Sequence, residues 1–149
     1  MAQKTQRTLL NHLVEVCRDA ERGFAIAART VKTAELKHLF YKLAEQRREF
    51  AQELLPHAQQ LDGTPVADGT SLAALHRAWI RMRARLATNP DRAVLEEAAR
   101  GERFAVAAYD EAVHDLLPAD ARELIEAQDL SVRVAERLMR DVDVTGGRR

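Results

Sequence analysis

The sequence predicts an all-α protein, a bundle of four long helices with a shorter helix in its longest connection. The 149-residue chain has 26 alanines but only 6 glycines and 4 prolines, a composition typical of helical proteins. Apolar residues recur at spacings of three and four, as on the buried face of an amphipathic helix. Glycine, proline and capping residues then divide the chain into helices at about residues 5–31, 34–61, 71–87, 91–117 and 119–143.

The first two helices are expected to form a tight hairpin. The stripe on 5–31 includes Leu13, Cys17 and Phe24, and only a short turn with Thr33 as the expected cap separates it from 34–61. Helices 91–117 and 119–143 form a second hairpin, because Pro118 suits a first helical turn. The expected core stripes of this hairpin include Tyr109 and Leu116, then Leu124, Val134 and Leu138.

The connection between the hairpins is long. The 29 residues from Asp62 to Pro90 exceed a tight turn, and they contain an amphipathic segment at 71–87 with Trp79 on its apolar face. A 17-residue helix spans roughly 25 Å, which is most of the length of a bundle. Two antiparallel hairpins joined by such a crossover have the connectivity of a ferritin-like four-helix bundle, and we expect one domain over residues 1–149 with a frayed tail at 144–149.

Composition also limits the function. Lys plus Arg and Asp plus Glu both number 23, so the net charge of 0 and pI near 7.0 argue against a nucleic-acid partner. A single cysteine excludes an intramolecular disulfide and a cysteine-rich zinc site, and fits a reducing cytosol. Neither a signal peptide nor a long uncharged apolar run is visible, so we expect a cytoplasmic protein with no membrane partner.

Each of the four long helices carries one polar residue on its apolar stripe. Such a residue needs a partner in the core. Folding the first hairpin brings Glu21 within about one turn of Arg47, so these two can pair. Tyr109 lies level with residue 126 and is expected to bond Glu126 or another inward polar group. The pattern therefore predicts a buried polar network that fixes helix register, formed by Glu21, Arg47, Glu102 and Gln128.

A di-iron or di-manganese site is the alternative reading of these inward carboxylates. Such a site takes a glutamate from each of two helices and Glu-x-x-His from each of the other two. No Glu-x-x-His motif of this sequence falls level with Glu21 or Glu102, and an arginine stays protonated and cannot replace the histidine. We therefore predict no cofactor. The alternative is an iron or manganese protein for ferroxidase, peroxide-handling or storage chemistry, with candidate ligands Glu21, Glu45, Glu102 and Glu136.

The segment 71–87 has a basic face formed by Arg77, Arg81 and Arg85. No acid lies between residues 71 and 88, whereas 91–143 is strongly acidic, so these faces can pair within the chain or across an oligomer. A second alternative function is a stress-related interaction module that docks a partner through this ridge. We expect a homodimer, because two-fold symmetry is the commonest and bundle helices often keep an exposed apolar edge.

Four motifs occur together in the chain: Asp19-Ala-Glu-Arg-Gly23, Ala44-Glu-Gln-Arg-Arg-Glu-Phe50, Leu75-His-Arg-Ala-Trp79 and Arg100-Gly-Glu102. With them the sequence, from about Leu9 to Val142, resembles an uncharacterised bacterial family of ferritin-like four-helix bundles, the domain of unknown function 2383. The resemblance implies the fold and no activity. Glu136-Arg137 stands where the family pattern has a His-Asp pair. No catalytic residue is indicated, and the sequence predicts a non-enzymatic bundle with a carboxylate–arginine network in place of a complete di-metal site.

Overall fold

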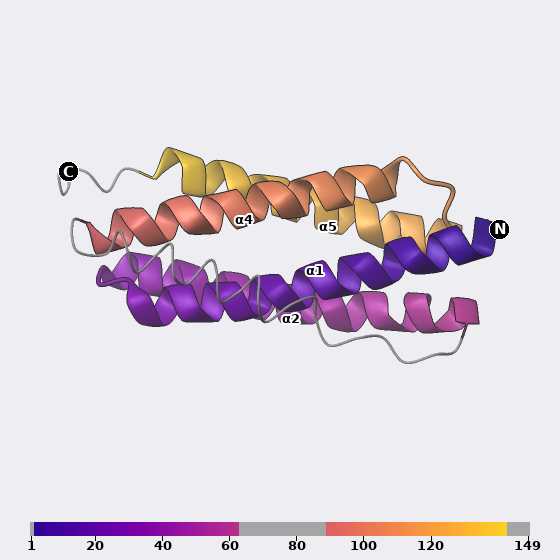
Figure 1. The fold of residues 1–149 in the computed structure, drawn as a ribbon, viewed down its shortest axis with the longest axis horizontal. Coiled ribbons are helices and arrows are strands. Elements are labelled where there is room, and N and C mark those ends of the chain that lie inside the picture. Colours follow the sequence, from indigo (N-terminus) through magenta and orange to yellow (C-terminus); the bar gives the residue numbers. More distant parts are fainter. Residues whose placement is uncertain (1, 63–88, 143–149) are drawn as a thin grey trace.

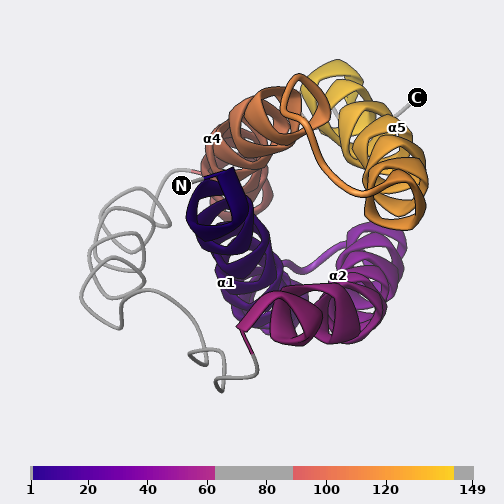
Figure 2. The same cartoon turned by 90° about the vertical axis from the view of Figure 1, so that its right-hand side faces the viewer.

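The computed structural model describes residues 2–62 and 89–142, which form four α-helices (Figure 1). Seen along their axes, the helices form a ring in the order α1, α2, α5, α4 (Figure 2). Consecutive helices pack against each other in antiparallel hairpins, α1 with α2 and α4 with α5. The predicted all-α, four-helix arrangement is confirmed, with bounds α1 Ala2–Thr30, α2 Ala34–Asp62, α4 Pro90–Val113 and α5 Ala119–Asp141.

The turn between α1 and α2 is held by a carboxylate from the start of α4. Asp91 accepts hydrogen bonds from the backbone N–H groups of Lys32, at 2.7 Å, and Thr33, at 3.1 Å, and from the Thr33 hydroxyl. Burial alone would raise the pKa of Asp91, but the hydrogen bonds from Thr33 and Lys32 outweigh it and lower the pKa below its ordinary value. This contact joins the two hairpins at one end of the bundle.

The helix predicted over 91–117 begins one residue earlier and ends four residues earlier. Asn89 is its N-cap, since the Asn89 side chain accepts from the Arg92 N–H at 3.1 Å, and Pro90 occupies the first turn. The helix ends at Val113 with His114 as its C-cap, and the short segment before Pro118 reverses the direction of the chain. Leu117 remains buried, whereas Leu116 is 78% exposed, which corrects its assignment to the core.

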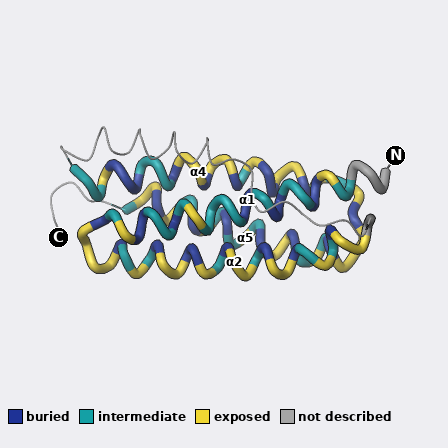
Figure 3. Tube along the Cα trace, turned by 60° about the horizontal axis from the view of Figure 1, so that its bottom comes forward, coloured by how far each residue is buried: buried dark blue, intermediate teal, exposed yellow. Residues whose placement is uncertain are grey.

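On α5 the predicted core stripe was wrong at two large apolar residues. Val134 and Leu138 are exposed. The helix α5 has two apolar stripes, and the stripe that packs in the core is the one without these two residues. The inward residues of α5 are Ala121, Ile125, Gln128, Val132, Ala135 and Met139. Figure 3 shows this alternation of buried and exposed positions along the helices.

The apolar core consists of two clusters, one toward each end of the bundle. On α2 one cluster stops at Ala44 and the other begins at Ala51, and on α4 the corresponding gap runs from Ala99 to Ala105. The polar residues Arg47 and Glu102 lie in these gaps. A polar layer therefore separates the two halves of the core.

The predicted crossover helix at 71–87 lies outside the described residues. Figure 1 shows that α2 ends at one end of the bundle and that α4 begins at the opposite end. None of the helices described here has the length and apolarity needed to cross a membrane.

Candidate functional site

The most buried charged groups of the described residues are Arg47 of α2 and Glu102 of α4, each 1% exposed. They come from helices on opposite sides of the ring, so their side chains meet across the centre of the bundle. Arg47 Nη1 donates to Glu102 Oε1 at 2.7 Å, and Nη2 donates to the second carboxylate oxygen. This two-point contact is the strongest geometry of an arginine–carboxylate pair.

Arg47 makes one further hydrogen bond and two aromatic contacts. Its Nε donates to Gln46 Oε1 at 3.1 Å, and the guanidinium carbon lies 5.4 Å from the Phe24 ring centroid and 5.9 Å from that of Phe50. Burial alone would lower the pKa of Arg47, but the hydrogen bonds and charge of Glu102 outweigh it and raise the pKa above its ordinary value. Arg47 is therefore a permanent cation in the core.

A second set of hydrogen bonds runs beside this pair and connects all four helices. Tyr109 of α4 donates its hydroxyl proton to Gln128 Oε1 of α5 at 2.7 Å, and Cys17 Sγ of α1 lies 3.1 Å from the same hydroxyl. Because the phenol has one proton, the thiol is the donor of the Cys17 contact. Gln128 Nε2 in turn donates to Glu53 Oε1 of α2 at 3.0 Å.

The thiol of Cys17 and the phenol of Tyr109 are both held in their neutral forms. Burial raises the pKa of the Cys17 thiol from 9.0 to about 11, although its hydrogen bond with Tyr109 partly opposes the shift. Burial, followed by the charge of Cys17, raises the pKa of Tyr109 well above its ordinary value. A protonated, buried thiol is a poor nucleophile. Cys17 therefore serves as a hydrogen-bond donor here.

Three of the four polar residues that the apolar stripes predicted to face inward do lie in the core. Arg47, Glu102 and Gln128 are buried, whereas Glu21 is only half-buried. The partner of Arg47 is Glu102, and the Glu21–Arg47 pair inferred from the hairpin register was wrong. Residues 20 and 21 both fit the spacing between Cys17 and Phe24, and it is Ala20 that packs on the core.

The sequence interpretation missed two contacts of the network. It treated Cys17 as an apolar side chain, although its position on the stripe of α1 was correct. Tyr109 was expected to bond Glu126 or another inward polar group, and its acceptor is the inward Gln128, whereas Glu126 is exposed. Glu53 accepts the last hydrogen bond of the series, from Gln128. It lies outside the core stripe of α2, so no spacing rule would have selected it.

The candidate metal ligands do not converge. Glu45 is exposed and pairs with Arg48 at 3.4 Å, and Glu136 lies 3.8 Å from Arg140 on its own helix. Glu102 is occupied by Arg47, and Glu21 is on the half-buried side of α1. Within residues 2–62 and 89–142 no three His, Cys, Asp or Glu side chains group as metal ligands. The described side chains therefore do not fit the di-metal centre of ferritin-like proteins.

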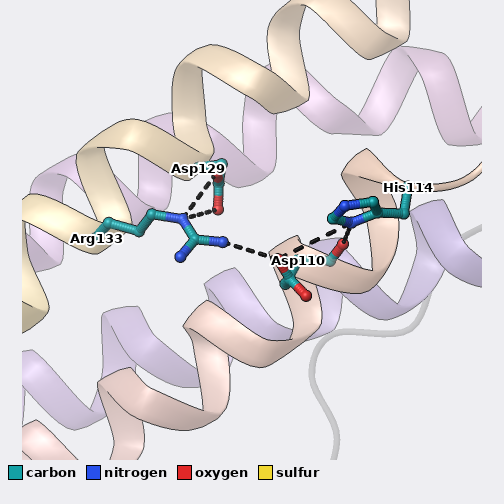
Figure 4. A network of polar contacts seen from close by, with 4 residues as sticks. All are labelled: Asp110, His114, Asp129 and Arg133. Carbon is teal, nitrogen blue, oxygen red and sulfur yellow. Dashed lines mark hydrogen bonds and ion pairs between the residues drawn. The ribbon is translucent and has the colours of Figure 1, made fainter.

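A surface network links α4 to α5. Arg133 Nε donates to both oxygens of Asp129 at 3.0 Å, and its Nη2 donates to Asp110 at 3.0 Å (Figure 4). His114 Nδ1 lies 2.7 Å from the Asp110 carbonyl oxygen. Arg133 is partly exposed and lies outside the core.

A cavity of about 190 Å³ lies between α1 and α4. Small residues widen it, notably Gly23 and Gly101, at which an added Cβ would meet nothing within 4 Å. Its wall is mainly apolar, with Asp19 and Glu97 among the lining residues. The Arg77, Arg81 and Arg85 ridge predicted on the crossover lies outside the described residues and stays a prediction.

Fold and site together define a four-helix protein whose core is divided by an arginine–glutamate ion pair. The chain belongs to the family described as Domain of unknown function (DUF2383), whose model matches residues 6–115 and so includes both members of that ion pair. No curated protein matches the sequence.

Proposed function

We propose that this chain is a ferritin-like bundle in which the Arg47–Glu102 pair takes the place of a di-metal centre, and that it acts as a non-enzymatic structural protein. The bidentate contact between the two buried groups carries the proposal. A guanidinium cation repels a divalent metal, and it occupies both oxygens of the only carboxylate that the described core contains. The pair and the Cys17–Tyr109–Gln128 chain specify how the four helices align.

The ends of the described helices support the ferritin-like connectivity. The end of α2 and the start of α4 lie at opposite ends of the bundle, and we propose that the connection between them runs along its length. The cavity between α1 and α4 offers an apolar groove for this segment, whose proposed helix at 71–87 has its own apolar stripe and an excess of arginine. Asp19 and Glu97 at the groove carry the opposite charge.

Trp79, the single tryptophan of the chain, reports on this crossover. If it packs in the groove, its fluorescence emission should lie well to the blue of that of the chain unfolded in guanidinium, because the indole leaves water. Replacing Gly101 with leucine should fill the groove and shift the emission back to the red, while Gly101→Ala serves as the matched control. A native emission equal to that of the unfolded chain would contradict the proposed crossover.

The proposed absence of metal chemistry has a direct test. We expect protein purified without chelator, then offered Fe(II) or Mn(II) in air, to retain far less than one metal per chain by mass spectrometry. About two metals per chain would be required of a di-metal protein. Retention at that level, lost in Glu102→Gln but kept in the exposed control Glu45→Gln, would overturn the proposal in favour of the carboxylate-bridged iron or manganese protein.

A further inference from the structure

The outer face of α5 carries an apolar stripe that no described part of the chain covers. Leu130, Val134 and Leu138 are 66%, 62% and 46% exposed. They are spaced four residues apart, so they lie on one face of the helix, opposite to the face that packs in the core. Single exposed apolar residues are ordinary on a protein surface, but a continuous row of branched aliphatic side chains marks a contact site.

The charged residues beside this stripe are arranged for a second copy of the same helix. Glu126 and Arg137 are both exposed, and they border the stripe on the same flank, toward α4. They are eleven residues apart, or about 16 Å along the helix, so they cannot pair within one chain. In the described residues neither takes part in an ion pair.

A two-fold axis perpendicular to α5, passing at the level of Val132, satisfies both features at once. It places Leu130 of one copy against Val134 of the other, so the two stripes overlap at these residues, and Leu138 lies level with residue 126 of the second copy. The same rotation brings Arg137 level with residue 127 of the second copy, next to Glu126. Because the axis turns each flank onto the same flank of the partner helix, two symmetric Glu126–Arg137 pairs close the contact.

The other charged group on the α4 side of α5 is already paired within the chain. Arg133 is held by Asp129 and by Asp110 of α4 (Figure 4), so its charge is already matched and it does not compete for Glu126. We propose that this protein forms an antiparallel homodimer through the outer face of α5, with the stripe Leu130, Val134 and Leu138 at its centre. This inference depends on the surface of α5 and is independent of the proposed role of the buried pair.

One helix face from each copy gives an interface at the small end of the known range, below about 1,200 Å² in total. The dimer should therefore be reversible and dissociate on dilution. Sedimentation velocity of the full chain over a concentration series should show this equilibrium. Val134→Glu should raise the dissociation constant at least tenfold, because the substitution puts two like charges in the centre of the contact. Tyr41→Glu, at a residue of α2 that is 53% exposed, is the matched control and should leave it unchanged.

The charge pair tests the geometry itself. At low salt Glu126→Arg and Arg137→Glu should each weaken dimerisation severalfold, and the double exchange should restore it, which no contact within one chain can explain. Circular dichroism of each variant should show unchanged helix content. A chain that is monomeric at every concentration, or a dimer that is indifferent to Val134→Glu, would overturn the proposal, and a double exchange without rescue would overturn the antiparallel two-fold arrangement.

Discussion

Replacing Glu102 with alanine is expected to lower the free energy of unfolding by about 3–5 kcal/mol. The variant removes the partner of Arg47 but leaves the guanidinium in the core, 1% exposed and flanked by Phe24 and Phe50. Arg47 cannot escape by losing its proton, because its ordinary pKa is already above the working range. Urea denaturation followed by circular dichroism at pH 7 measures the loss.

Two further variants distinguish a buried unpaired charge from a general loss of side-chain contacts. Glu45→Ala, which removes an exposed carboxylate on α2, should change stability by no more than about 0.5 kcal/mol. The double variant Arg47→Met with Glu102→Leu removes both charges and should regain most of the stability lost in Glu102→Ala. If Glu102→Ala proved as mild as Glu45→Ala, the pair would not be desolvated and the proposed core would be wrong.

A stable Arg47→Met, Glu102→Leu variant would also indicate that the pair serves to fix the register of the helices. Two apolar side chains can give as much stability as a buried ion pair, but they do not fix which residue lies opposite which. Arg47 and Glu102 mark the gap between the two apolar clusters on α2 and α4, so they define the register between hairpins. The variant should then keep its helices and lose definition of its packing, visible as broadened side-chain NMR signals.

Sequence periodicity was enough to place Arg47, Glu102 and Gln128 in the core, because each lies three or four residues from apolar neighbours on its stripe. Periodicity could not find the partner of Arg47. Counting residues from a tight turn relates only the two helices of one hairpin, whereas Arg47 and Glu102 belong to different hairpins and meet across the ring. Their pairing depends on how the hairpins dock, and this is a tertiary property.

The same limit explains the errors on α5. Its sequence offers apolar residues on two faces, one with Ile125 and Val132 and one with Val134 and Leu138. Helical spacing identifies both faces and cannot rank them, since the choice depends on the shape of the cavity between the other helices. The unused face is the one for which we propose a second copy of the chain as its partner.

The stability of this protein is expected to fall steeply in alkaline solution because of one thiol. In the native state the pKa of Cys17 is raised from 9.0 to about 11, chiefly by burial. A group whose pKa is higher in the native state binds its proton more tightly when the protein is folded. Its contribution to the free energy of unfolding is therefore complete below pH 9 and is lost as the pH passes through 11. A difference of two pKa units corresponds to about 3 kcal/mol of unfolding free energy at 25 °C once the thiol is fully ionised in both states.

Cys17→Ser isolates this effect. The serine hydroxyl can still donate to Tyr109, but it does not titrate in this range. The difference in unfolding free energy between the two proteins should be constant up to about pH 8.5. By pH 11 the cysteine protein should have lost about 2 kcal/mol of stability relative to the serine variant. Parallel curves across this range would mean that the thiol is hydrated in the native protein, and the hydrogen-bonded chain from Cys17 to Gln128 would then be open to water.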